Sequence, residues 1–162
     1  DGSGQISGEQ FVDECQVESD LELLLPADYV TGSSERMLLY RELDSLTLEK
    51  DVQAFRERLE DRFGPVPNET EELLRIVSLR RLAARLGVEN VYLKGGRMSL
   101  FFVSNPDSPY YQSQAFGKMI DYMMKYTRRC DLREQNNRRS MLVKNVTTVE
   151  EAVYILREIA LL

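Results

Sequence analysis

The chain has 162 residues, a length typical of one domain, with 43% hydrophobic and 30% charged residues. No apolar run approaches the roughly 20 residues that span a bilayer, which excludes an integral membrane protein. The net charge of −6 disfavours bulk attraction to DNA or to an anionic membrane.

The amino-terminal residues are acidic and polar, so they do not form a signal peptide, and we expect a cytoplasmic protein. The chain begins with Asp1-Gly2-Ser3-Gly4, which is typical of a linker. We therefore interpret it as a piece of a longer protein.

Several kinds of chemistry are missing from the composition. The chain has no histidine, which excludes Ser-His-Asp and Cys-His triads and every histidine-ligated metal site. Its two cysteines, Cys15 and Cys130, cannot form a zinc site alone, and we interpret them as unpaired thiols in a reducing compartment. Neither a P-loop nor a dinucleotide-binding glycine motif is present. We therefore expect no catalytic, metal-binding or cofactor-binding residue, and no enzyme activity in this chain.

The charges are unevenly distributed along the sequence. Residues 1–35 contain nine acidic residues and no Lys or Arg, whereas residues 128–144 have a net charge of +4. The basic segment allows a weak nucleic-acid contact through Arg128, Arg129, Arg133, Arg138 and Arg139. The alternative, which we favour, is a solvated hairpin face that pairs with neighbouring acids.

The first third of the chain predicts an arm, a strand and two helices. Residues 1–16 are expected to form a flexible acidic arm before a domain that spans 17–162, and residues 17–25 favour a strand. Ser33 or Ser34 is expected to cap a helix that ends near Leu46, and Thr47 to cap the next. The apolar positions expected to face the core are Met37, Leu38, Tyr40 and Leu43 in the first helix, and Val52, Phe55, Leu59 and Phe63 in the second.

The next segment predicts a central buried helix. Gly64 and Pro65 end the preceding helix, and Asn68 with Glu71 resembles a capping box. The apolar stripe that follows, up to Gly87, is too wide for a surface helix.

Two hairpins and two helices complete the predicted order. Gly95-Gly96 between 91–94 and 97–103 favours a type I′ turn, and Asn136-Asn137 favours a second hairpin between 130–135 and 138–144. Between the hairpins we expect a helix with Phe116, Met119, Ile120, Met123 and Met124 inward, and Thr148 is expected to cap a last helix. The order β-α-α-α-ββ-α-ββ-α predicts an α+β fold, in which a mixed or antiparallel sheet of about five strands packs with about five helices.

Two groups of side chains are candidates for binding. Glu57, Arg58 and Asp61 lie on the helix face opposite Phe55 and Leu59, where solvation makes acid–base catalysis improbable but leaves either a protein contact or a plain solvated face. The second group consists of tyrosines that could stack on nucleic-acid bases, although their helical spacing favours partly buried packing within the domain. These residues are Tyr110, Tyr111, Tyr122 and Tyr126.

Four motifs in order resemble one known family. The run Leu59 to Pro67, LEDRFGPVP, is similar to the D-R-F-G-x-x-P signature of the C-terminal domain of bacterial transcription-repair coupling factors. The run Leu23 to Val30, LLLPADYV, resembles the strand exit of that family. The other two similar segments are Arg36 with Leu39-Tyr40-Arg41, and Leu79-Arg80 through Ala83 to Leu86-Gly87-Val88.

The resemblance implies a regulatory domain without catalysis. In this family the domain docks on an N-terminal module that resembles UvrB, covers the surface that UvrA would bind, and restrains the motor. The parent protein is expected to bind RNA polymerase and double-stranded DNA, to use ATP and magnesium in motor domains elsewhere, and to recruit excision repair. No membrane partner is implied.

The same resemblance implies the interface residues. The docking contacts of the family lie on the helix that ends in D-R-F-G, where Asp61 and Arg62 match position by position. A third contact is acidic in the family, but here the position is Arg58, with Glu57 beside it. This departure predicts a compensating acidic group on the partner module.

Overall fold

The computed structural model describes residues 10–162, so residues 1–9 of the predicted arm lie outside the described part. The strands are β1 (Gln16–Ser19), β2 (Val88–Lys94), β3 (Arg97–Phe102), β4 (Cys130–Gln135) and β5 (Arg138–Lys144). The helices are α2 (Ser33–Ser45), α3 (Glu49–Phe63), α4 (Asn68–Arg85), α5 (Gln114–Lys125) and α6 (Val149–Ala160), with a short 3₁₀ turn, η1 (Pro109–Gln112).

The chain folds as two compact units. Residues 22–79 form one, here called the helical unit, and residues 10–21 with 80–162 form the other, here called the sheet unit. No helix of the described residues is long and apolar enough to cross a membrane.

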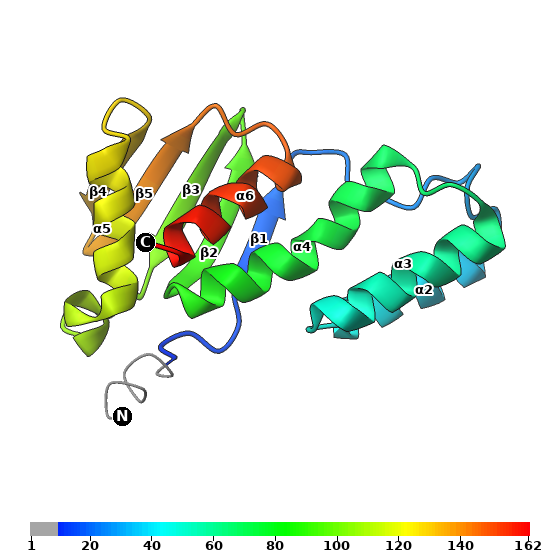
Figure 1. Cartoon of the computed structure of the whole chain (residues 1–162), viewed down its shortest axis with the longest axis horizontal. Coiled ribbons are helices and arrows are strands. Elements are labelled where there is room, and N and C mark those ends of the chain that lie inside the picture. The colour runs from blue at the N-terminus through cyan, green and yellow to red at the C-terminus, as the bar shows by residue number, and fades with distance from the viewer. Residues whose placement is uncertain (1–9) are drawn as a thin grey trace. The chain divides into compact units, whose positions relative to one another are not determined.

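The sheet unit contains one five-stranded mixed sheet. Its strand order is β1-β2-β3-β5-β4, with β1 parallel to β2 and the other neighbours antiparallel. Helices α5 and α6 and the end of α4 lie on one face of this sheet (Figure 1). Alternate strand residues such as Val91, Leu100 and Met141 are fully buried against them. This architecture confirms the predicted α+β fold.

Both hairpins form where the turn residues predict them. Gly95 and Gly96 have φ of 63° and 73°, and Asn136 and Asn137 have φ of 55° and 62°. Positive φ at both central residues matches the twist of the flanking strands, which is why glycine and asparagine stand there. The predicted bounds of the second hairpin are confirmed.

The predicted strand over 17–25 is wrong beyond Ser19. The hydroxyl of Ser19 accepts a hydrogen bond from the backbone N–H of Leu21, which turns the chain away from the sheet. Further on, the carbonyl of Leu24 accepts a bond from the Thr70 hydroxyl instead of a ladder bond. In the part of the predicted arm that the structure describes, Val12 and Cys15 are buried.

Several details of the predicted helices are also wrong. The N-cap residues of α2 and α3 are Gly32 and Leu48, and neither helix has a side-chain cap, so the predicted serine and threonine caps are not used. The Glu71 carboxylate, which was predicted to form a capping box with Asn68, accepts hydrogen bonds from the Arg56 guanidinium instead. Thr148, in contrast, accepts from the N–H of Glu151 and caps α6 as predicted.

Three predicted core residues are exposed, namely Met37, Leu38 and Met124. Helix α2 is rotated so that Leu39 faces the core together with Tyr40 and Leu43, which were predicted to face it. Periodicity alone left this rotation ambiguous, because apolar residues occupy positions 37 to 40 without a break.

The helical unit has its own core, in which α2, α3 and α4 pack together. Its buried members are Leu25, Val30, Leu43, Phe55, Leu59, Leu74 and Val77. This core fixes which side of α3 faces outward.

Candidate functional site

Helix α3 presents a charged outer face. Phe55 and Leu59 are 1% and 2% exposed and face the core, whereas Glu57, Arg58 and Asp61 are exposed. Arg62 extends the same exposed face. Residues four apart lie on one side of a helix, so the structure brings the predicted interface residues together.

Two arginines of this face pair with acids of α2. Arg58 forms an ion pair with Glu42, and the guanidinium of Arg62 lies 2.7 Å from Glu35. Arg58 is therefore already paired within the helical unit, and the acidic group expected on the partner module stays a prediction. Each pair is largely solvated, because both arginine side chains are more than half exposed.

The two carboxylates of this face differ in their partners. The Glu57 carboxylate accepts a hydrogen bond from the Gln53 amide at 3.2 Å. The Asp61 carboxylate makes no ion pair or hydrogen bond with any residue from 10 to 162. Asp61 is thus the charged group of this face that remains available to another surface.

A hollow of about 310 Å³ lies beside Asp61, between α2 and α3. Its floor is apolar and its rim is charged. The lining residues are Glu35, Leu39, Phe55, Arg58, Leu59, Asp61, Arg62 and Phe63. An apolar floor with a charged rim is the arrangement found in protein–protein contacts.

The end of α3 is held in place by Tyr29. The Tyr29 hydroxyl donates to the carbonyl oxygens of Leu59 and Gly64 at 3.2 and 2.9 Å, and its ring packs on Phe63. Burial, and then the nearby Glu60 carboxylate, raise the pKa of Tyr29, so this donor keeps its proton. Gly64 ends the helix with φ of 92° and ψ of −167°, a conformation restricted to glycine. The segment that contains Tyr29 and the D-R-F-G segment at the end of α3 are therefore held together by these hydrogen bonds and this ring contact.

Another ion pair joins α3 to α4. The guanidinium of Arg56 donates to both carboxylate oxygens of Glu71, with the shortest contact at 2.7 Å. This hydrogen bonding raises the pKa of Arg56 and keeps the pair charged. Two-point contacts of this kind fix orientation as well as charge.

The five arginines of the basic segment do not form one patch. Arg129 donates to the carbonyl oxygens of Lys144 and Asn145 and to Glu151, which gives it a structural role. Arg139 lies 4.4 Å from the ring centre of Tyr111. Arg128 is exposed, whereas Arg133 and Arg138 lie beside a hollow on the sheet.

The tyrosines considered as stacking surfaces are used inside the sheet unit. Tyr110 and Tyr122 are 0% and 1% exposed, and the Tyr110 hydroxyl donates to the carbonyl oxygen of Leu86 at 2.7 Å. Tyr126 donates to Glu158 and packs on Tyr122. The predicted packing role is confirmed for these three.

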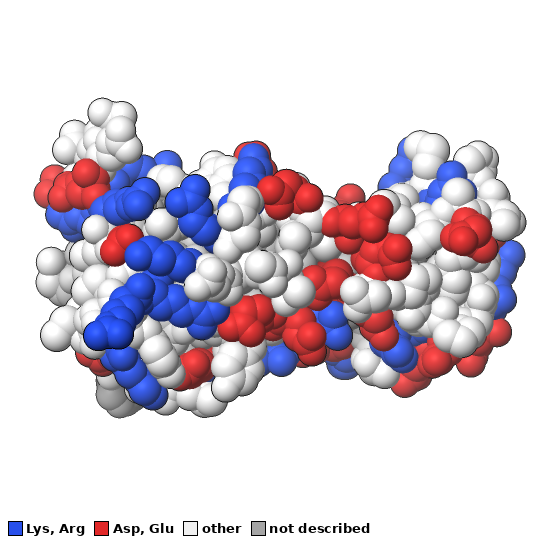
Figure 2. Space-filling model, turned by 90° about the horizontal axis from the view of Figure 1, so that it is seen from above, with Lys and Arg blue, Asp and Glu red and all other residues white. Residues whose placement is uncertain are grey.

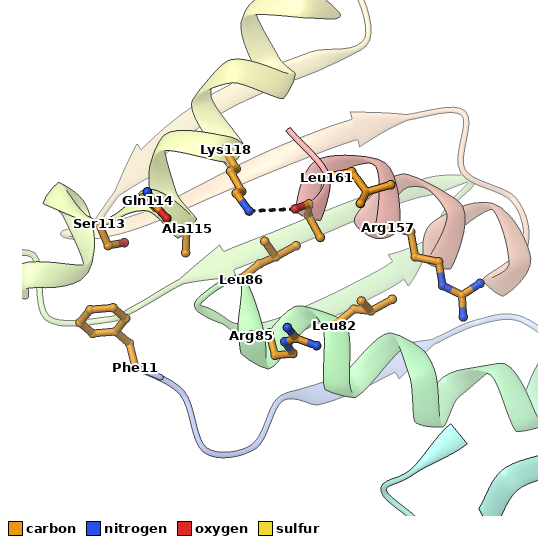
Figure 3. A pocket seen from close by; sticks show the side chains of 11 residues that line it. Phe11, Leu82, Arg85, Leu86, Ser113, Gln114, Ala115, Lys118, Arg157 and Leu161 are labelled. Atoms are coloured by element: carbon orange, nitrogen blue, oxygen red, sulfur yellow. Dashed lines mark hydrogen bonds between the residues drawn. The ribbon is translucent and has the colours of Figure 1, made fainter. Parts of the chain in front are cut away.

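A cavity of about 440 Å³ lies between α5, α6 and the end of α4, all within the sheet unit (Figure 3). Arg85, Lys118 and Arg157 line it together with apolar side chains. Lys118 donates to the carbonyl oxygen of Ala160 at 2.8 Å and thereby satisfies the last turn of α6. The lining residues, all drawn from 10–162, include no carboxylate or thiol that could act as an acid, base or nucleophile.

The two thiols are poor nucleophiles. Cys15 and Cys130 are both unpaired and buried. Burial raises the pKa of Cys15 to about 12 and also raises the pKa of Cys130, so both stay protonated near neutral pH. Residues 10–162 contain no group of three acidic or cysteine side chains that could hold a metal ion.

A family model described as the TRCF domain matches residues 19–113, which is more than half of the chain. The chain belongs to the TRCF domain family. The matched region of this TRCF domain includes Tyr29 and all of α2, α3 and α4, and so contains Asp61 and Arg62. It ends before β4, so the second hairpin lies outside the match.

Known relatives agree with this assignment. Transcription-repair-coupling factors of Rickettsia bellii and Borreliella burgdorferi are 29% and 23% identical to the chain over 81% and 98% of its length. The chain spans only 11% and 14% of those two relatives. A crystal structure of the C-terminal domain of a transcription-repair coupling factor matches with a TM-score of 0.68 and 18% identity, covering 91% of this chain and 93% of that one. The structural likeness shows that the fold is shared.

Sequence reasoning missed Glu35 and Glu42, the α2 partners of the two arginines. Their spacing of seven residues places them on one face of α2, which was the available signal. It also missed the role of Tyr29, whose two hydrogen bonds depend on a loop that no periodic pattern describes.

Proposed function

We propose that this TRCF domain is a regulatory docking domain that binds, through α3, an N-terminal UvrB-like module of its parent protein. The observation that carries the proposal is Asp61, an exposed carboxylate without an ion-pair partner in the described chain, beside a hollow lined by apolar and charged side chains. It stands at a position that matches a docking contact of the family.

In this proposal the docked state covers the surface that UvrA binds and restrains an ATP-dependent DNA translocase in the parent. The parent protein would release RNA polymerase stalled at DNA lesions and recruit excision repair. The names of the relatives support a role in coupling transcription to repair.

The energetics define what Asp61 must contribute. Shifting a two-state equilibrium from 1:99 to 99:1 takes about 5.5 kcal/mol, so holding the docked state at 99% takes about half of that. Truncating one partner of a desolvated charge pair costs about 2–5 kcal/mol, whereas an exposed pair is worth less than about 1 kcal/mol. One substitution therefore opens the docked state only if Asp61 becomes buried against a cation.

The test is calorimetric titration of this chain with the UvrB-like module of its parent, with UvrA as competitor. We expect saturable binding that UvrA displaces, and we expect Asp61→Ala to weaken it by about 30-fold or more. The matched control is Asp44→Ala, which removes an exposed carboxylate from α2 and should leave binding unchanged.

The same two substitutions, Asp61→Ala and Asp44→Ala, should also be tested in the full-length parent protein. Asp61→Ala is expected to raise both UvrA binding and the ATPase rate, and Asp44→Ala neither. If the two variants behave alike in both assays, Asp61 is not the docking contact.

A further inference from the structure

The face of the sheet opposite the helices is not covered by another element of the sheet unit, as far as residues 10–162 show (Figure 1). Register places two rows of side chains on this open face. One row is Glu18, Tyr92, Ser99, Leu142 and Asp131, and the next is Asn90, Phe101, Ser140 and Arg133. Side chains on the same row lie about 5 Å apart. Leu142 and Ser140 are buried beneath their neighbours, so the accessible surface consists of the longer side chains around them.

Two aromatic rings stand in the middle of this open face. Tyr92 on β2 and Phe101 on β3 are half-buried, and their rings meet edge to face with centres 5.4 Å apart. No helix of the sheet unit, as described over residues 10–21 and 80–162, lies on this face, and the side chains beside the rings are polar or charged (Figure 1). Aromatic rings in this position offer flat surfaces to a planar ligand.

Cations surround the two rings. The strand residues of the open face include five, which are Lys94, Arg97, Arg133, Arg138 and Lys144. They outnumber by one the four acids beside them, which are Glu18, Asp20, Glu89 and Asp131. Within residues 10–162, every one of the five cations except Arg97 forms an ion pair with one of these acids. Figure 2 shows Lys and Arg side chains gathered at the end of the sheet unit toward which β2 and β5 run. A surplus of positive charge on this face attracts an anionic partner in spite of the overall charge of −6.

Two of these cations lie over the rings themselves. The guanidinium of Arg138 lies 5.3 Å from the ring centre of Phe101, and the ammonium of Lys94 lies 5.6 Å from that of Tyr92. Arg97 has no acidic partner among the described residues. The positive charge therefore adjoins the aromatic surface.

A hollow of about 300 Å³ lies beside Phe101 on the same face. Its lining combines an aromatic wall with hydroxyls, amides and two guanidinium groups, and contains no acid. The residues are Ser99, Phe101, Arg133, Gln135, Asn136, Arg138, Ser140 and Leu142. Hollows of this size hold a small planar ligand, and amides with hydroxyls can donate to and accept from the edge of a nucleobase.

We propose that the open face of the sheet binds single-stranded nucleic acid. An unpaired base stacks on the aromatic wall at Phe101 with its edge against the amides of the hollow, while Arg133 and the neighbouring cations contact phosphates. Sheets with central aromatic rings suit unstacked bases. A duplex is read instead by an element that enters a groove, which a broad sheet face does not do. This activity is separate from docking through α3, because its residues belong to the other unit.

The test is fluorescence anisotropy of a labelled single-stranded DNA of about 15 nucleotides with this chain at low salt. We expect saturable binding, weakened roughly tenfold by Phe101→Leu, which keeps an apolar side chain but removes the ring. Arg133→Gln should also weaken binding, and it should reduce the dependence of affinity on salt. The matched control is Arg41→Gln, which removes one exposed cation from the helical unit and should leave affinity unchanged.

Two further measurements guard against a trivial loss of folding. Circular dichroism should show that each variant remains folded, and amide chemical shifts of the unmodified chain should move at Tyr92, Ser99 and Phe101 when DNA is added. Three results would overturn the proposal: no saturable binding at low salt, equal loss in Arg41→Gln, or tighter binding of a duplex with no effect of Phe101→Leu. A fourth result would also overturn it, namely amide chemical-shift changes confined to parts of the chain outside the open face when DNA is added.

Discussion

At the residue scale, Gly87 combines two constraints. Its φ is 79°, and a Cβ atom built there would lie 2.0 Å from Cε1 of Tyr110. Tyr110 cannot easily move, because it is fully buried and its hydroxyl bonds to the carbonyl of Leu86. The sequence predicts Gly87 as a helix end but contains no sign of the ring that lies against it, since the two are far apart along the chain.

The substitution Gly87→Ala is therefore expected to be costly. Left-handed backbone costs a non-glycine residue about 1–2 kcal/mol, and overpacking adds about 1–3 kcal/mol. The matched control is Gly95→Ala, which has φ of 63° but open space around its Cβ. Urea unfolding should show a larger loss for Gly87→Ala by about 1–3 kcal/mol. Equal losses of unfolding free energy in the two variants would mean that the Tyr110 ring moves aside without destabilising the protein.

At the element scale, the sequence predicts secondary structure best where backbone conformation selects the residue. The turns at Gly95-Gly96 and Asn136-Asn137 require positive φ, and both form as expected. The N-caps Gly32 and Leu48 were missed because neither has a side chain that caps the helix, so tertiary packing determines where these helices begin. For the candidate site, the motif located α3, but its pairing with α2 depends on a rotation that periodicity did not define.

The position of the α3 end depends on Tyr29, and Tyr29→Phe tests this. The substitution keeps the ring against Phe63 and removes both hydrogen bonds to the last turn. Native-state hydrogen exchange should show weaker protection in the final turn of α3, with a loss of overall stability of about 1 kcal/mol.

The control for Tyr29→Phe is Tyr40→Phe. The Tyr40 hydroxyl accepts from the backbone N–H of Leu25 at 2.7 Å and makes no hydrogen bond to α3. Its loss should lower stability to a similar extent but leave the exchange protection of the last turn of α3 unchanged. If both variants lower that protection equally, Tyr29 does not hold the α3 end specifically.

At the scale of the whole molecule, the chain divides into two compact units although its sequence reads as one domain. Helix α4 contributes residues to both units, so no change of composition or linker marks the boundary near residue 79. The two proposed surfaces lie on different units, with Asp61 in one and Phe101 in the other. Neither surface shares a contacting residue with the other.

Two binding functions without shared residues are expected to be independent. The double variant Asp61→Ala with Phe101→Leu should lose affinity for each partner by the amount of the matching single variant, within about 0.5 kcal/mol. Saturating single-stranded DNA should likewise leave the calorimetric affinity for the UvrB-like module unchanged. A change in either direction would reveal coupling between the two units, and by reciprocity the module would then alter the affinity for DNA by the same factor.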